Sequence, residues 1–249
     1  WGGEGHAVFS RTMLDIRKIK AISLDLDDTL WPVWPTIARA EQVLHDWLGE
    51  HAPKTAELFA SPLALREIRE SMTAQRPDLQ HDLSALRRES IRLALNRAGD
   101  APALADAAFE VFFAERQRVD FYDDALAALT FLGSRFPLVA LSNGNADVQR
   151  VGIGQHFRAT LSAREFGVGK PDPRIFHAAA RAVQVRPEDV LHIGDDATLD
   201  ALGAINAGLQ AVWINRAGHA WPHDGEPPLT LASLSPLCAL LSSGAGSRG

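Results

Sequence analysis

Acidic residues follow a short apolar stretch near the start of the chain. Residues 21–24 are apolar apart from one serine, and Asp25, Asp27 and Asp28 come soon after them. This pattern predicts a buried strand that presents carboxylates at its carboxyl end, the edge where ligands bind in open α/β sheets. Crowded carboxylates repel one another unless a cation joins them, and Mg²⁺ is the simplest partner for such oxygens. For Asp25 and Asp27 to serve one site, the chain must bend after Asp25, or one residue must act through its backbone carbonyl.

Two further motifs carry residue types that suit phosphate chemistry. Ser142, Asn143 and Gly144 end a second apolar run. A tight turn there would offer a hydroxyl and free backbone N–H groups to phosphate oxygens. Lys170 lies between a glycine and a proline on a loop that leads into a helix, where its charge could neutralise a carboxylate and a phosphate together.

A third apolar run, residues 191–193, is again followed by acids. Gly194 allows a turn, Asp195 and Asp196 come next, and Asp200 lies in the first turn of the helix expected at 199–207. The motif therefore repeats the arrangement of the first strand, with carboxylates at a strand end.

Strands and helices alternate from residue 121 onward. The patterns predict helices at 123–132 and 199–207 and strands at 137–141, 191–193 and 211–214. Such alternation is typical of an α/β fold whose parallel sheet carries helices on both faces. We expect this α/β core to comprise residues 19–33 and 121–241, with terminal extensions at 1–18 and 242–249. The Gly-rich start, residues 1–6, and the tail, residues 242–247, are expected to be poorly ordered.

Residues 34–120 carry a different, all-helical pattern. Helices are expected at 36–50, 63–75, 82–98 and 102–119, and two prolines exclude a helix interior between Trp31 and Pro35. Trp31 and Trp34 could each contact a substrate or pack beneath the helices. The charges of four arginines are expected to face solvent: Arg87, Arg88, Arg116 and Arg118.

Composition limits the class of protein. The 249 residues carry a net charge of −6, which argues against a broad nucleic-acid-binding face. No apolar run approaches the ~20 residues of a membrane span, and the single cysteine, Cys238, cannot form an internal disulfide. The first residues lack a basic start and an apolar core, so we expect no signal peptide and a cytoplasmic location.

The four motifs together, in this order, resemble those of the haloacid dehalogenase-like hydrolases. The resemblance covers nearly the whole chain and implies a Rossmann-like core with a helical cap domain inserted after the first strand. It also implies that Asp25 is the nucleophile, that Asp27 is the general acid and base, and that Lys170 stabilises developing charge. Phosphatases of this superfamily have an acid at the position of Asp27, whereas its dehalogenases lack one.

The same resemblance implies a cofactor and its ligands. Mg²⁺ would bind the Asp25 and Asp195 carboxylates and the Asp27 carbonyl, with Asp196 either a further ligand or an acceptor behind the ligands. Ser142, Asn143, Gly144 and Lys170 would hold the phosphoryl oxygens. Asp200 would position Lys170, and Thr29 would orient Asp27 or its loop.

Three runs narrow the resemblance further: Asp-Leu-Asp-Asp-Thr-Leu-aromatic, Ser-Asn-Gly-Asn-Ala and Leu-His-Ile-Gly-Asp-Asp. They are similar to a bacterial subgroup associated with flavin mononucleotide and the phosphorylated ribitylamino-uracil of riboflavin synthesis. We therefore expect a Mg²⁺-dependent phosphomonoesterase acting on a small metabolite. A phosphomutase, a 2-haloacid dehalogenase and a non-catalytic binding protein remain alternatives, and the sequence does not indicate an oligomeric state.

Overall fold

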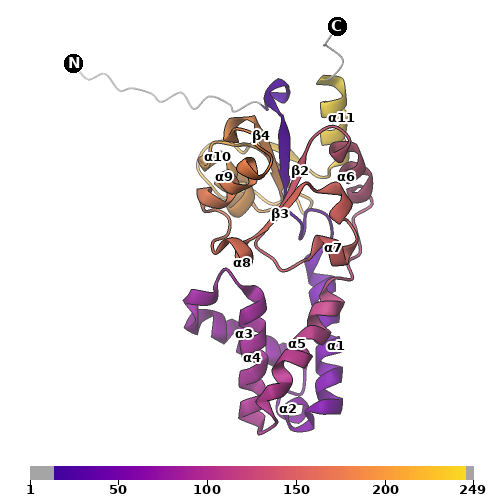
Figure 1. Cartoon of the computed structure of the whole chain (residues 1–249), viewed down its shortest axis with the longest axis vertical. Coiled ribbons are helices and arrows are strands. Elements are labelled where there is room, and N and C mark those ends of the chain that lie inside the picture. Colours follow the sequence, from indigo (N-terminus) through magenta and orange to yellow (C-terminus); the bar gives the residue numbers. More distant parts are fainter. Residues whose placement is uncertain (1–13, 245–249) are drawn as a thin grey trace, which may run out of the picture.

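The computed structural model describes residues 14–244, and in this range six strands form one parallel sheet (Figure 1). The strand order is β3-β2-β1-β4-β5-β6. The strands are β1 (Ala21–Leu24), β2 (Leu138–Ser142), β3 (Ala159–Ser162), β4 (Val190–Gly194), β5 (Gln210–Ile214) and β6 (Leu229–Leu231). The order reverses at β1, so the strands β2, β1 and β4 are neighbours at the centre of the sheet. The motifs that begin at Ser142, Asp25 and Asp195 therefore follow three adjacent strands.

Helices cover both faces of the sheet, as the alternating pattern predicts. α6 (Ala125–Gly133) and α11 (Ser235–Gly244) pack on the face that carries Ile22 and Leu24. α9 (Pro173–Ala182) and α10 (Gly203–Asn206) pack on the opposite face against Ala21 and Val139. Successive side chains of a strand point to opposite faces, and helices cover both faces here, so β1 is buried along its whole length.

Short helices fill the remaining connections of the α/β unit. They are η1 (Ile16–Lys18), α7 (Val148–Val151), η4 (Gly154–His156), α8 (Ala163–Phe166), η5 (Pro187–Asp189) and the π-helix η6 (Ala197–Leu202). The helix expected at 199–207 is thus two elements, η6 followed by α10. Within residues 14–244 no helix is long and apolar enough to cross a membrane.

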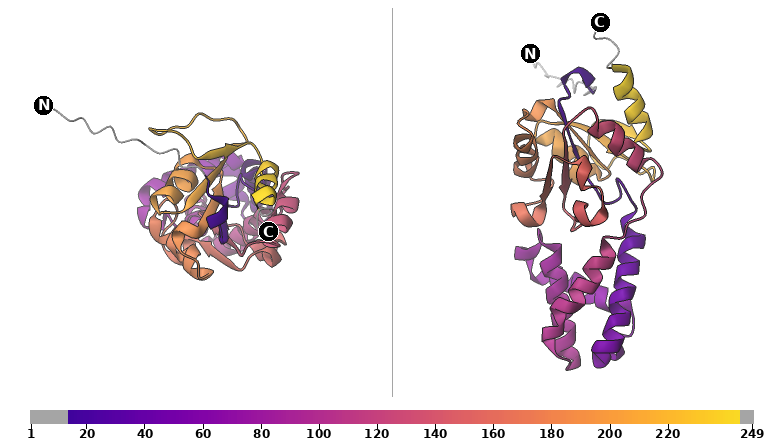
Figure 2. Two further views of the ribbon diagram at one scale, coloured as in Figure 1. Left: turned by 90° about the horizontal axis from the view of Figure 1, so that it is seen from above. Right: turned by 45° about the vertical axis from the view of Figure 1, so that its right-hand side comes forward.

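The chain between β1 and α6 forms a separate helical lobe (Figures 1 and 2). Its helices are α1 (Val33–His51), α2 (Pro53–Leu58), α3 (Pro62–Gln75), η2 (Pro77–Leu79), α4 (Leu83–Ala98), η3 (Pro102–Leu104) and α5 (Ala105–Arg116). The lobe has its own apolar core, in which Leu44 of α1 and Phe109 of α5 are both 2% exposed. The lobe lies beyond the carboxyl ends of the strands, over the edge that carries the acids.

Several expected boundaries differ from the structure. α1 begins at Val33 and includes Pro35, because the first turn of a helix needs no backbone N–H from proline. The expected helix 102–119 is η3 followed by α5, and α2, β3 and β6 were not predicted. Ser242 and Ser243 belong to α11 rather than to an extension, and Leu14 and Ile16 pack on the core. The Gly-rich start, residues 1–6, and residues 245–247 of the tail, which we expect to be poorly ordered, lie outside the described residues.

Candidate active site

Asp25 lies immediately after β1 and is 6% exposed. Its backbone N–H still donates to the Ile193 carbonyl of β4. The chain then bends, as expected: Asp28 has a φ of +57°, and its N–H donates to the Trp31 carbonyl at 2.8 Å. This turn sends the Asp25 and Asp27 side chains to different partners.

A buried chain of polar contacts leads from Asp25 across the strand ends. Lys170 Nζ donates to Asp25 Oδ1 and to Asp200 Oδ1, both at 2.5 Å. Asp200 Oδ1 also accepts from His192 Nε2 at 3.0 Å, and His192 Nδ1 lies 2.8 Å from Ser23 Oγ. Because a carboxylate cannot donate, His192 carries its proton on Nε2 and accepts at Nδ1 from the Ser23 hydroxyl.

The pKa values in this chain follow burial and charge. Burial disfavours the Lys170 cation, but Asp200 and Asp25 outweigh it and raise the Lys170 pKa above its usual range. Burial opposes the Asp200 anion, yet Lys170 and His192 hold the pKa of Asp200 well below its usual value. Burial lowers the pKa of His192, so this ring is neutral. Lys170 is therefore a fixed cation next to Asp25.

Three carboxylates lie close together at this strand edge, and the Lys170 cation contacts two of them. One positive charge does not balance three negative charges. Oxygens of Asp25, Asp195 and Asp200 lie within 4.8 Å of one another. Burial and the neighbouring Asp200 and Asp28 raise the pKa of Asp195 to about 7. Burial also raises the pKa of Asp25 well above its usual value, with Lys170 opposing. An all-oxygen, electron-rich cluster of this kind fits a hard divalent cation, which would remove the repulsion.

Three contacts of this cluster differ from the sequence-based expectations. The Thr29 hydroxyl lies 3.3 Å from Asp25 Oδ2 and 3.1 Å from Asp195 Oδ1, rather than against Asp27. Asp196 Oδ1 accepts from the Thr198 and Leu199 N–H groups at the start of η6, and Asp196 is not among the clustered carboxylates. Asp200 lies in the cluster itself as well as beside Lys170.

Asp27 has a partner that sequence analysis missed. Arg116 Nη2, at the end of α5, lies 2.6 Å and 2.7 Å from the two oxygens of Asp27, and Trp31 Nε1 donates to Oδ1 at 2.8 Å. Arg116 is 1% exposed, so the expectation that it faces solvent is wrong. Trp31 is also fully buried, whereas Trp34 is 59% exposed. No sequence motif marks Arg116, because helical spacing does not show which element will cover a given face.

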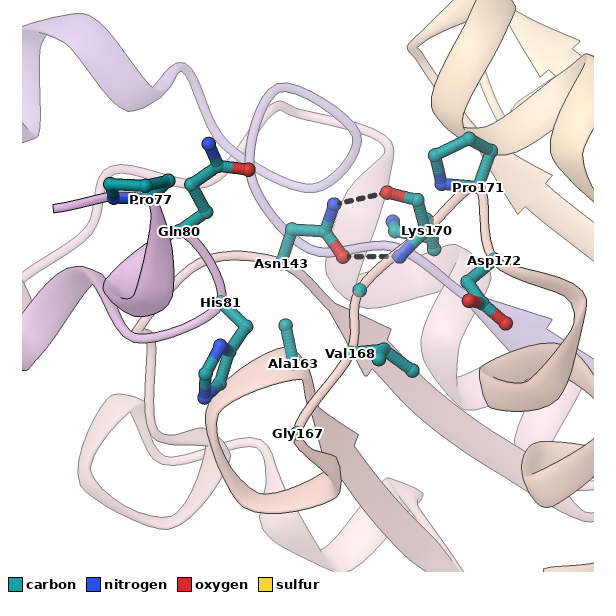
Figure 3. Close-up of a pocket in the computed structure, with 11 residues that line it drawn as sticks. Pro77, Gln80, His81, Asn143, Ala163, Gly167, Val168, Lys170, Pro171 and Asp172 are labelled. Atoms are coloured by element: carbon teal, nitrogen blue, oxygen red, sulfur yellow. Dashed lines mark hydrogen bonds between the residues drawn. The ribbon is translucent and has the colours of Figure 1, made fainter. Parts of the chain in front are cut away.

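The turn after β2 lies next to Asp27 and Lys170. The Gly144 N–H donates to Ser142 Oγ at 2.9 Å, and a Cβ at Gly144 would lie 2.4 Å from Asp27 Oδ2. Asn143 uses both ends of its amide on the Lys170 backbone, at 2.8 Å each (Figure 3). The Asn143 side chain thus holds the Lys170 loop in place. Asn143 could then bind a phosphate only through its backbone N–H, because its side-chain amide is already used.

Two cavities open between the helical lobe and the strand edge. One, of about 440 Å³, is lined by Asp27 and Gly144 on the strand side and by Trp34 and Arg116 on the lobe side. The other, of about 560 Å³, lies where His81 of the lobe faces the Lys170 loop (Figure 3). Sizes of this order are typical of small-molecule sites.

The sequence matches the haloacid dehalogenase-like hydrolase family over residues 19–208. The chain belongs to this family. It is therefore an enzyme of the hydrolase class, and its Rossmann-like parallel sheet is the fold of the family.

Haloacid dehalogenase-like relatives include phosphatases and dehalogenases. The chain is 32% identical to the 5-amino-6-(5-phospho-D-ribitylamino)uracil phosphatase YigB of Escherichia coli, covering 90% of this chain and 97% of the relative. It is 38% identical to a phosphoserine phosphatase of Thermus thermophilus, over 59% of this chain and 62% of the relative. A structure described as a 2-haloacid dehalogenase from Pseudomonas syringae is 39% identical, with a TM-score of 0.82 over 91% of this chain and 99% of that one.

Proposed function

We propose that this family member is a Mg²⁺-dependent phosphomonoesterase that forms an aspartyl-phosphate on Asp25. The observation that carries the proposal is Asp27. Its carboxylate lines the 440 Å³ cavity and lies beside the Ser142–Gly144 turn, two residues from the buried Asp25. An acid in this place supplies the proton that an alkoxide leaving group needs, which carbon–halogen cleavage does not require.

Each of the site residues has its own role in the proposed reaction. Asp25 attacks phosphorus, and Asp27 protonates the departing oxygen and later accepts a proton from the hydrolytic water. Lys170 and the backbone N–H groups after Ser142 hold the phosphoryl oxygens. Because Arg116 donates to both oxygens of Asp27, one oxygen must leave Arg116 and carry a proton before Asp27 can protonate the leaving oxygen.

A divalent cation would be held by the Asp25 and Asp195 carboxylates and the Asp27 carbonyl. When bound, Mg²⁺ would draw charge from the phosphoryl group. The acid cluster described above supports Asp25 and Asp195 as ligands by its donor chemistry and its raised pKa values. The Asp27 carbonyl is proposed from the family resemblance.

The substrate we propose is flavin mononucleotide or a related phosphate of riboflavin synthesis. The Escherichia coli relative, which matches over nearly its full length, is named for a phosphorylated ribitylaminouracil, and this name supports the second of these choices. Flavin mononucleotide is proposed from the resemblance of the three sequence runs. We also propose that residues 34–120 act as a cap that selects the substrate, since the 440 Å³ cavity draws most of its lining from α1, α3, α4 and α5.

The test is phosphate release from flavin mononucleotide, sugar phosphates, nucleotides and phosphoglycolate, each with Mg²⁺ and with chelator. Mg²⁺-dependent release from at least one ester is expected. The dehalogenase alternative, favoured by the 39% identical structure, predicts halide release from a 2-haloacid instead. A phosphomutase would return an isomeric sugar phosphate without free phosphate.

A further inference from the structure

The lobe side of the 440 Å³ cavity combines an apolar wall with arginine side chains. The apolar wall consists of Trp34 and Ile37 of α1, Leu86 of α4 and Phe112 of α5. The Arg87 guanidinium carbon lies 3.7 Å above the centroid of the Phe112 ring, and the Arg87 side chain is 9% exposed. The expectation that Arg87 faces solvent is therefore wrong, and its charge lies at the wall of the cavity.

The positive charge of this wall exceeds its negative charge. Arg69, Arg87 and Arg116 line the cavity, against the carboxylates of Asp27 and Glu70. Arg69 and Arg87 share the carboxylate of Glu41 with Arg66, and Arg69 also lies 3.9 Å from Glu70. Both hydrogen bonds from Arg87 reach the same Glu41 oxygen, each at a long 3.3 Å. A guanidinium has five N–H donors, so Arg87 keeps capacity for another acceptor.

Arg116 adds unused donors at the same cavity. Its Nη2 binds Asp27, but its Nε and Nη1 atoms are buried and have no hydrogen-bond partner among the described residues. Unpartnered buried donors are costly, so a native protein rarely keeps them without a ligand or water to receive them. Arg87 and Arg116 thus offer free donors beside the apolar surface, while Glu70 and Thr73 of α3 supply acceptors in the same lining.

We propose that this wall, centred on Arg87 and Phe112, binds the leaving part of the substrate as a planar ring that bears carbonyl oxygens. The ring packs against the apolar residues, and the arginines donate to its oxygens. A polyol would suit the wall less well, because it would leave the apolar residues of the wall in contact with water. The proposal rests on the proposed phosphatase function, since it places the phosphate of the same molecule at Asp25.

The matched probes are flavin mononucleotide and ribitol 5-phosphate, which share the ribityl phosphate and differ by the ring. We expect the intact enzyme to prefer flavin mononucleotide in kcat/KM by at least about tenfold. The Arg87→Met variant should lose about ten- to a hundredfold in kcat/KM for flavin mononucleotide, the range for a hydrogen bond to a charged group. The loss for ribitol 5-phosphate should be much smaller.

The control is Arg92→Met, which removes a half-exposed arginine of the same helix that pairs with Glu89 and Asp106 outside the cavity. This variant should leave kcat/KM unchanged for both flavin mononucleotide and ribitol 5-phosphate. Since Arg87 is buried and its replacement could weaken folding, Trp34→Ala provides a second variant at an exposed position, and it should raise KM for flavin mononucleotide selectively.

Riboflavin binding to the Asp25→Asn protein, followed by quenching of flavin fluorescence, separates this proposal from the proposed function. Binding that Arg87→Met weakens, without hydrolysis of any ester by the unmodified enzyme, would retain the ring site and overturn the phosphatase. Hydrolysis with equal kcat/KM for both probes, unchanged by Arg87→Met and Trp34→Ala, would overturn the ring site and retain the phosphatase.

Discussion

Among single residues, Asp195 gives the clearest link between charge and metal binding. Its pKa of about 7 without metal means that the folded protein holds a proton there which the unfolded chain, near 3.8, releases. Between pH 4 and 7 this group therefore makes the metal-free protein less stable as pH rises. At pH 8 the carboxylate is charged and unpaired, which is the state that a cation relieves.

We therefore predict that Mg²⁺ stabilises the protein more at higher pH. The affinity of the protein for Mg²⁺ should fall at least about tenfold per pH unit below about pH 7, because the cation displaces the Asp195 proton. Thermal melting with and without Mg²⁺ at pH 5.5 and pH 8 measures this. The shift in Tm should be larger at pH 8, and Asp195→Asn should remove the difference. An equal shift at both pH values would argue against Asp195 as a ligand.

Asp27 is the proposed acid and base of the reaction, and it also accepts hydrogen bonds from two buried side chains. Asp27→Ala would leave the Arg116 cation and the Trp31 N–H buried without an acceptor. We expect the free energy of unfolding to fall by about 3 kcal/mol, as when one partner of a buried ion pair is removed. Urea denaturation checks this, with the exposed Asp123→Ala as control. A stability equal to that of the unmodified protein would show that the Arg116 contact contributes little.

At the scale of elements, the ends of β1, β2 and β4 determine which side chains meet. Asp200 folds back from η6 over the end of β4, where a Cβ at Gly194 would lie 2.3 Å from the Asp200 Cγ. The missing side chain at Gly194 thus lets Asp200 reach Lys170 and His192. The contact explains why a glycine closes this strand, beyond the turn that it permits.

Gly194→Ala should consequently displace Asp200 and disturb Lys170. We expect phosphatase activity to fall at least about tenfold and stability to fall by about 1–3 kcal/mol, the usual cost of overpacking. Gly49→Ala is the matched control, because that glycine lies inside α1 with nothing within 4 Å of a new Cβ. The control should be neutral or stabilising. Equal activity in both variants would contradict this account of β4.

At the scale of the whole molecule, the α/β core was predictable because its strands are buried and their ends carry recognisable motifs. The helical lobe was predictable as helices, through Leu44 and its periodic neighbours. The side chains that the lobe contributes to the site were not predictable. Arg87 and Arg116 read as surface charges because periodicity indicates a face of a helix but not its partner. β3 and β6 were missed because they are short and only partly buried.

The reacting groups and most of the cavity wall belong to different parts of the molecule. Lys170 and the strand-end acids belong to the α/β unit, whereas most of the 440 Å³ cavity belongs to the lobe. Overall sequence identity does not separate the phosphatase relative from the structure described as a dehalogenase. Asp27 favours the phosphatase, and the covalent chemistry must be tested at Asp25 itself.

The most direct test is to trap the covalent intermediate. The enzyme is mixed with a hydrolysed phosphate ester and Mg²⁺, quenched in acid within one turnover, and its peptides are mapped by mass spectrometry. The account predicts a phosphoryl group on Asp25, and neither label nor turnover in Asp25→Asn. Full turnover by Asp25→Asn, or a label on another residue, would contradict it.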